Sequence, residues 1–200
     1  MQSLPLATYE RFAEFLQKRI NTQQHLTEDS VRYAFFLAVV QTTSILQHEI
    51  ILELPHPKFP GKEIDTYIAA SDGRSELFFE FKFHRSSKST SPKPQKAGSL
   101  FKDISRLASL VAKDRHCLVV YFTCPEMARY FEKNKGSYSE FWKQPTGGEF
   151  NYDDLFLVKT TNTFRKASGE HHEARVLIEF NAALASGYHV RVFDVRGIYP

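Results

Sequence analysis

Apolar residues recur at helical spacing along the first part of the chain. Four of them, Phe12, Phe15, Leu16 and Ile20, predict a short amphipathic helix over residues 9–20. A second helix is predicted from Thr27, a suitable N-cap before two acidic residues, to about residue 45. The interior of this second helix, residues 33–40, is apolar nearly all round, so we expect it to be buried.

The hydrophobic period then changes from helical to alternating, which is typical of strands. Residues 48–54, 62–70 and 76–84 alternate in this way. Turn-forming residues separate them, Pro55-His56-Pro57 after the first segment and Ser71-Asp72-Gly73 after the second. The three segments therefore predict an antiparallel meander.

Helices and strands are predicted to alternate in the middle of the chain. A polar loop over residues 85–96 precedes a helix over residues 97–113 and a buried strand over residues 117–123. Another helix is predicted to begin at Pro125. A succession of strand, helix and strand indicates an α/β protein.

The last third of the chain has weaker patterns. Residues 135–151 are Gly-rich and predict irregular structure, and residues 155–160 predict a strand. Residues 174–195 alternate around a Ser186-Gly187 break, which predicts a terminal hairpin. No internal repeat and no linker is visible, and 200 residues are a usual length for one domain, so we expect a single domain.

Composition narrows the class of protein. Hydrophobic residues make up 42% of the chain and aromatic residues 14%, which excludes a disordered chain. The longest apolar stretch, residues 33–40, is too short to span a membrane. Cys117 and Cys124 lie in an apolar run without CxxC spacing, which predicts buried thiols in a reducing compartment. No signal peptide is recognisable at the start, so we expect a cytoplasmic protein.

The third predicted strand places charged residues among phenylalanines. Because successive side chains of a strand point to opposite faces, Glu80, Lys82 and His84 share one face with Phe78. Phe79, Phe81 and Phe83 lie on the other face. A carboxylate and an ammonium surrounded by Phe are costly unless they meet each other, a metal ion or a substrate.

Asp65 offers a partner for this pair from the preceding strand. Ile64, Thr66 and Ile68 would turn to the other face, and pairing through the Asp72-Gly73 turn would bring Asp65 alongside Glu80. Two close carboxylates repel, and a divalent cation relieves that repulsion. Oxygen ligands without Cys or His suit Mg²⁺ or Mn²⁺.

Asp65 followed by Glu80-Phe81-Lys82 resembles the motif of the PD-(D/E)XK nuclease superfamily, with Ile64 where that motif often has proline. The resemblance extends over residues 26–123, in the order helix, strand, Asp strand, ExK strand, helix, strand. It implies a restriction-endonuclease-like α/β/α core with a mixed β-sheet flanked by helices. Residues 124–200 would then be a C-terminal elaboration of one nuclease-like domain.

The resemblance also implies a site and a reaction. Asp65, Glu80 and the backbone carbonyl of Phe81 would ligate Mg²⁺, with Mn²⁺ as a possible substitute. Lys82 would orient or deprotonate the attacking water, and phosphodiester hydrolysis would leave 5′-phosphate ends. In this family an acidic residue on an N-terminal helix often completes the site, and Glu28 is the best positional match. Glu53 competes with Glu28 as the third carboxylate.

Simpler interpretations stand beside these. Glu80 and Lys82 could form a surface ion pair, which contributes little. Asp103 and Arg106 are three residues apart on a predicted helix and could pair with each other.

The charge of the chain is unevenly distributed. The formal net charge is +3, but residues 82–106 carry +6 and the remaining residues −3. Lys and Arg release counterions from a nucleic-acid backbone, so this stretch predicts contacts with phosphates. The candidate contact residues are His84, Arg85, Lys88, Lys93, Lys96, Lys102 and Arg106.

These features favour a Mg²⁺-dependent nuclease, foremost a DNA endonuclease of a defence, phage or repair system. Its expected partner is nucleic acid, with DNA preferred to RNA, and a homodimer is a further possibility. The alternative is a catalytically inactive nucleic-acid-binding or assembly module on the same fold. A structural domain without a nucleic-acid role would leave the +6 segment unexplained.

Overall fold

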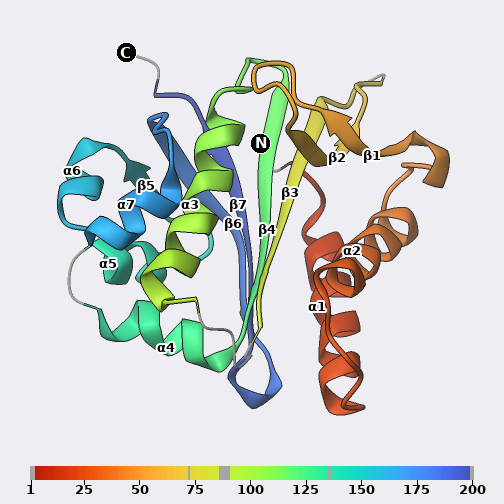
Figure 1. The fold of residues 1–200 in the computed structure, drawn as a ribbon. Helices are drawn as coiled ribbons and strands as arrows, with labels where there is room; N and C mark the ends of the chain where they lie inside the picture. The colour runs from red at the N-terminus through yellow and green to blue at the C-terminus, as the bar shows by residue number, and fades with distance from the viewer. Residues whose placement is uncertain (1–2, 72, 86–90, 135–136, 199–200) are drawn as a thin grey trace.

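In the part of the chain that the structure describes, seven strands form one mixed sheet with helices on both faces (Figure 1). The computed structural model describes residues 3–71, 73–85, 91–134 and 137–198. The strand order is β1-β2-β3-β4-β7-β6-β5. The predicted α/β class, with a mixed sheet flanked by helices, is confirmed.

The predicted meander forms one edge of this sheet. β1 (Ile50–Pro55), β2 (Glu63–Ile68) and β3 (Glu76–His84) follow one another along the chain and pair antiparallel. β1 is the edge strand, and β3 lies inside the sheet between β2 and β4 (Arg115–Thr123).

β3 and β4 run parallel along their full length, from Glu76 beside Arg115 to His84 beside Thr123. A parallel pair needs a crossover connection, and α3 (Lys93–Ala108) lies within it. The apolar stripe of α3 faces the sheet, because its buried residues include Leu100, Ile104 and Leu107. The predicted helix over residues 97–113 exists, but its observed bounds are Lys93–Ala108, so it begins and ends earlier in the chain than predicted.

α1 (Leu6–Asn21) and α2 (Glu28–Thr42) cover the other face of the sheet (Figure 1). Thr27 is the N-cap of α2, as predicted: its side chain accepts a hydrogen bond from Ser30 N at 3.0 Å. Phe35 of α2 packs edge-on against Phe79 and Phe81 of β3, with ring centroids 5.3 and 5.5 Å apart. This contact fixes α2 against β3 and so places Glu28 near β3.

The C-terminal third extends the same sheet and adds four short helices to the α3 face. Its elements are α4 (Pro125–Lys133), α5 (Ser137–Lys143), β5 (Glu149–Tyr152), α6 (Asp154–Val158), α7 (Asn162–Ser168), β6 (Ala174–Ala183) and β7 (His189–Arg196). Short 3₁₀ turns occupy Gln47–Glu49 and Ala185–Gly187. The predicted terminal hairpin is confirmed, because β6 and β7 pair antiparallel.

Two expectations for this third of the chain were wrong. Residues 155–160 do not form a strand, because Asp153 accepts a hydrogen bond from Phe156 N at 2.8 Å and starts helix α6. Residues 135–151 are not irregular throughout, since α5 and β5 lie among them. Trp142 of α5 stacks on Phe131 of α4 at 5.2 Å, so tertiary packing stabilises a segment whose sequence lacks a helical period.

Two expectations drawn from composition can be compared with the structure. Cys117 and Cys124 are free and buried, as predicted. No helix in the described ranges has the length and apolar character needed to cross a membrane.

A close approach of α3 to α7 generates the first testable prediction. A Cβ placed on Gly98 would lie 2.5 Å from the carbonyl oxygen of Phe164 and 2.7 Å from Ala167 Cβ. We expect Gly98→Ala to lower the free energy of unfolding by about 1–3 kcal/mol, because overpacking outweighs the better helix propensity of alanine. Urea unfolding measures this, with exposed Lys102→Ala on the same helix as control. Equal stability of Gly98→Ala and wild type would refute the close packing of α3 on α7.

Candidate functional site

The site is built where β2 leaves β3. The ladder between these strands runs from Ile68 beside Leu77 to Thr66 beside Phe79. Beyond it, the side chain of Asp65 accepts a hydrogen bond from the backbone N–H of Phe81 at 2.7 Å. Buried backbone donors need partners, and here a carboxylate takes the place of a neighbouring strand.

Glu28 also accepts a hydrogen bond from the backbone of β3, two residues further along the strand. Its carboxylate accepts a hydrogen bond from the N–H of Phe83 at 2.9 Å. In a strand, the N–H groups of residues two apart point the same way, so Asp65 and Glu28 line the same edge of β3. The structure therefore places Glu28 beside the strand that carries Glu80 and Lys82, whereas the competing Glu53 is exposed.

The backbone is irregular beside Asp65. Leu52 pairs with Thr66 and Leu54 with Ile64, so Glu53 lies between them with a φ of +55°. This left-handed conformation is uncommon for a residue other than glycine and costs of order 1–3 kcal/mol.

At this irregularity, the side chains of β2 also switch from one face of the sheet to the other. Ile64 packs in the core beneath α3, whereas Ile68 packs in the core beneath α1 and α2. The expectation that Ile64, Thr66 and Ile68 share one face was therefore wrong for Ile64, because β2 is not a regular strand at Asp65.

The alternation predicted for β3 is confirmed. Leu77, Phe79 and Phe81 belong to the core beneath α1 and α2. Glu80 and Lys82 instead meet side chains of α3. The phenylalanine row thus anchors the charged face of β3 from behind.

Four charged side chains form a network between β3 and α3. Arg106 lies 2.7 Å from a Glu80 carboxylate oxygen and 3.2 Å from Asp103. Lys82 Nζ lies 2.9 Å from Asp103 Oδ2. Asp103 and Arg106 do pair with each other, as the simpler interpretation expected, but each also binds a residue of the ExK strand.

Burial and neighbouring charges make Glu80 an unusual acid. Its residue is 2% exposed, and its Oε1 atom is buried with no hydrogen-bond partner among the described residues. Burial, followed by the charges of Asp103 and Asp65, raises the pKa of Glu80 to about 9. Arg106 and Lys82 act in the opposite direction without cancelling these effects. Glu80 therefore keeps its proton at neutral pH, because the neighbouring cations do not offset the cost of placing another negative charge in the site.

Lys82 is a cation at neutral pH. Burial lowers the pKa of Lys82, but attraction by Asp103 and Glu28 outweighs burial, and the net shift is above the ordinary value. A lysine held in this state donates hydrogen bonds and does not accept a proton. Burial also raises the pKa of Glu28, although Lys82 and the Phe83 N–H oppose that shift.

His84 ends the charged face of β3 as a neutral group. It is 6% exposed, and its Nδ1 lies 2.8 Å from the hydroxyl of Tyr121. Burial, with help from the charges of Lys82 and Lys96, lowers the pKa of His84 to about 3. A phosphate contact by His84 would therefore come from a neutral imidazole, not from a cation.

The remaining candidate phosphate contacts are spread along α3 and the segment before it. Arg85, Lys93 and Lys102 are exposed, and Lys96 is half-buried. Arg106 is already paired with Glu80 and Asp103. Lys88 lies outside the described residues.

The donors fit a divalent cation. All of them are oxygens, which Mg²⁺ and Mn²⁺ prefer, and the unpartnered Glu80 Oε1 is a free ligand atom. The charge of Asp65 raises the cost of ionising Glu80, an effect that a bound cation would oppose. Asp65, Glu80 and Glu28 do not converge as a compact ligand set of three side chains, since the two such groups found in the described residues contain none of them. A two-carboxylate site completed by the Phe81 carbonyl remains the prediction.

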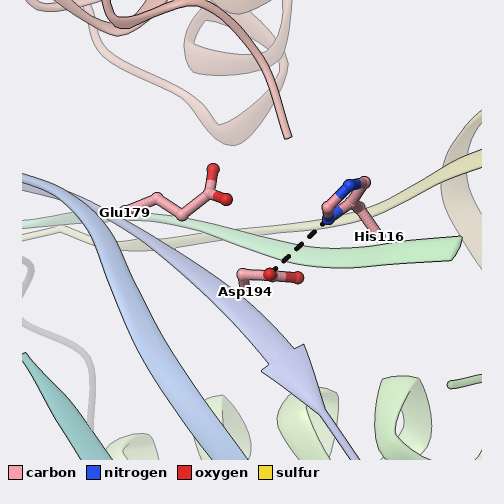
Figure 2. Close-up of side chains that lie close together, drawn as sticks. All are labelled: His116, Glu179 and Asp194. Atoms are coloured by element: carbon pink, nitrogen blue, oxygen red, sulfur yellow. Dashed lines mark ion pairs between the residues drawn. The ribbon is translucent and has the colours of Figure 1, made fainter. Parts of the chain in front are cut away.

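One of those two groups lies on the opposite face of the sheet. Figure 2 shows His116, Glu179 and Asp194, with His116 Nδ1 3.5 Å from Asp194. Glu179 accepts hydrogen bonds from Ser3 and Tyr9, and Arg196 donates to Asp194 at 2.8 Å. These contacts satisfy both carboxylates, so the group pins the N-terminal segment to the sheet.

The other group combines His171 with two exposed carboxylates, Asp154 and Glu173. Among the described residues its ion pair is long, with 3.8 Å between His171 Nε2 and Asp154 Oδ1. Neither group contains a residue of the predicted site.

Sequence reasoning missed Arg32. Its guanidinium lies 3.4 Å from Asp65 Oδ1 and over the ring of Phe81, 5.8 Å from the centroid. Arg32 follows Glu28 by four residues on α2, so the two side chains share one face of that helix. That spacing could have identified it.

Comparison of the chain with protein-family models, with curated proteins and with solved structures gives no match in any of the three.

The raised pKa of Glu80 predicts a pH dependence of stability. Between about pH 4.5 and pH 9 the unfolded chain has released the Glu80 proton while the folded chain retains it, so this residue makes stability fall as pH rises. We therefore expect the difference in unfolding free energy between Glu80→Gln and wild type to shift in favour of the variant from pH 5.5 to pH 8.5. Urea unfolding at the two pH values tests this, with exposed Glu10→Gln as control. A difference that does not change with pH would show that Glu80 is ionised throughout.

Proposed function

We propose that this protein is a Mg²⁺-dependent nuclease that hydrolyses phosphodiester bonds, with DNA as the preferred substrate. The observation that carries the proposal is the hydrogen bond from Phe81 N to the Asp65 carboxylate, which holds Asp65 beside the residue of β3 that lies between Glu80 and Lys82. The element order α2, β1, β2, β3, α3, β4 also supports it, because it is the order that the PD-(D/E)XK resemblance implies.

Asp65, Glu80 and the Phe81 carbonyl are the groups that would hold the metal ion. When bound, Mg²⁺ would polarise the scissile phosphate and lower the pKa of an attacking water. The protein contributes rigidity, because Asp65 is hydrogen-bonded to the strand that carries Glu80 and Phe81.

Lys82 supplies positive charge to the same site. Since its ammonium stays protonated, its proposed role is to orient the water and to stabilise the charge that develops on the phosphate. Of the two roles expected from the sequence, orienting or deprotonating the water, only the first is therefore proposed for Lys82. Asp103, 2.9 Å from Lys82, positions the ammonium and keeps it charged.

A second candidate function is a binding module without catalysis. It is favoured by the pairing within the site, where Arg106 lies 2.7 Å from Glu80 and Arg32 lies 3.4 Å from Asp65. In that case the carboxylates would serve to hold β3, α2 and α3 together, and the cations alone would meet nucleic acid.

Cleavage assays separate the two functions. The purified protein is incubated with plasmid DNA, linear DNA and RNA, with Mg²⁺ or Mn²⁺. We expect cleavage, and we expect Asp65→Asn, Glu80→Gln and Lys82→Gln each to reduce its rate by about a hundredfold or more, as for loss of a group that stabilises a transition state. Asn and Gln keep hydrogen-bonding side chains of similar size, so the fold should survive, and circular dichroism checks this.

Glu10→Gln is the matched control, since Glu10 is an exposed carboxylate on α1, across the sheet. Cleavage by all three site variants at the wild-type rate would exclude the proposed site. Tight, salt-sensitive binding without cleavage would instead support the binding module.

Metal binding can be measured without activity. At pH 8 we expect Mg²⁺ at one hundred times its dissociation constant to stabilise the wild type by about 2.7 kcal/mol, visible as a rise of several degrees in Tm. The double variant Asp65→Asn, Glu80→Gln should show no such rise. The same rise in the double variant would place the ion elsewhere.

A further inference from the structure

α4 and the first turn of α3 enclose a groove that the functional site does not use. Its volume is about 490 Å³. The lining residues are Lys93, Glu126, Arg129, Tyr130, Lys133 and Asn134. Three are basic and one is acidic, so the groove carries a net positive charge.

The three cationic side chains of this groove have no partner among the residues that the structure describes. Within the described ranges, the side chains of Lys93, Arg129 and Lys133 form neither a hydrogen bond nor an ion pair. Some cations elsewhere do have such partners: Arg74 contacts Glu49 and Arg115 contacts Glu76. Arg129 and Lys133 are four residues apart on α4, so they point from the same face of that helix toward one side of the groove.

The groove lies next to the candidate site, at the end of β3 and the first turn of α3. Cys124 N donates to the carbonyl of His84 at 2.8 Å, which fixes the start of α4 to the end of β3. In Figure 1, α4 lies beside the first turn of α3. α3 runs antiparallel to β3 along its charged face (Figure 1). The contacts follow in order along both elements: Arg106 with Glu80, Asp103 with Lys82, and Ser99 Oγ with His84 at 3.3 Å.

The distance between site and groove suits a nucleic-acid strand. Lys93 precedes Asp103 by ten residues on one helix, which is about 15 Å at 1.5 Å per residue. Phosphates along one strand of B-form DNA are spaced by about 3.4 Å of helix axis, so the groove lies about four or five base steps from the site. Lys96 lies between the two.

We propose that this groove binds the phosphate backbone of the nucleic-acid strand that leaves the candidate site, through Lys93, Arg129 and Lys133. The proposal rests on the function proposed above, and it assigns substrate contacts to residues 125–134, outside the region of family resemblance. The groove contacts are electrostatic and do not select a sequence. The Tyr130 ring offers a surface beside which a base or sugar can pack.

Binding without cleavage tests the proposal. Fluorescence anisotropy with a labelled DNA duplex, its single strand and an RNA of the same sequence is measured in EDTA, over a range of salt concentrations. For the double variant Arg129→Glu, Lys133→Glu we expect an increase in Kd of about tenfold or more. The slope of log K against log salt should fall by about 2, as for two lost phosphate contacts.

The matched control is Lys18→Glu, Arg19→Glu. It also reverses one Lys and one Arg near the end of a helix, but on α1, across the sheet. Equal effects of the two double variants would overturn the groove, and so would a wild type that binds none of the three nucleic acids.

The outcome for the groove is separable from that for the site. Reduced binding by the groove variant, with no cleavage by the wild type in Mg²⁺, would support the groove and refute the nuclease. Cleavage and binding at the wild-type level in the groove variant would support the nuclease and refute the groove.

Discussion

The arrangement of this protein depends on how the free edge of β3 is satisfied. Where β2 turns away, the backbone N–H groups of Phe81 and Phe83 lose a strand partner. Asp65 and Glu28 accept those hydrogen bonds, each carboxylate coming from a different element. Without such acceptors, each buried donor would cost about 1–3 kcal/mol. The same substitution of carboxylates for a strand opens the sheet and gathers acidic groups around Glu80 and Lys82, so one solution to a hydrogen-bonding problem creates the site.

Much of this could be predicted from the sequence, because the responsible patterns are local. The alternation in residues 76–84 assigned Glu80 and Lys82 to one face of β3, and the Thr27 cap placed Glu28 at the start of α2. The residues of α3 that contact Glu80 and Lys82 were harder to predict from the sequence. Asp103 and Arg106 were recognised as a pair, but no period in the sequence says which face of α3 opposes Glu80. That depends on the crossover between β3 and β4.

The errors have physical causes of the same kind. Ile64 was assigned to the wrong face because Glu53 adopts a left-handed backbone, which no residue pattern of β1 announces. Helix α6 was mistaken for a strand because its apolar run has high β-propensity, while a single cap at Asp153 and tertiary packing decide its conformation. Arg32 was missed because its role depends on where α2 packs. In each case a contact distant in sequence outweighs a local preference.

The close packing of Gly98 against α7 has a mechanical consequence for α3. A close contact with α7 midway between Lys93 and Asp103 resists bending of this uninterrupted helix, which favours a fixed separation of the two residues. If a strand is held at the first of these residues and hydrolysed beside the second, α3 acts as a ruler. The position of the cut would then be set by length along the backbone from the held phosphate, whatever bases lie between.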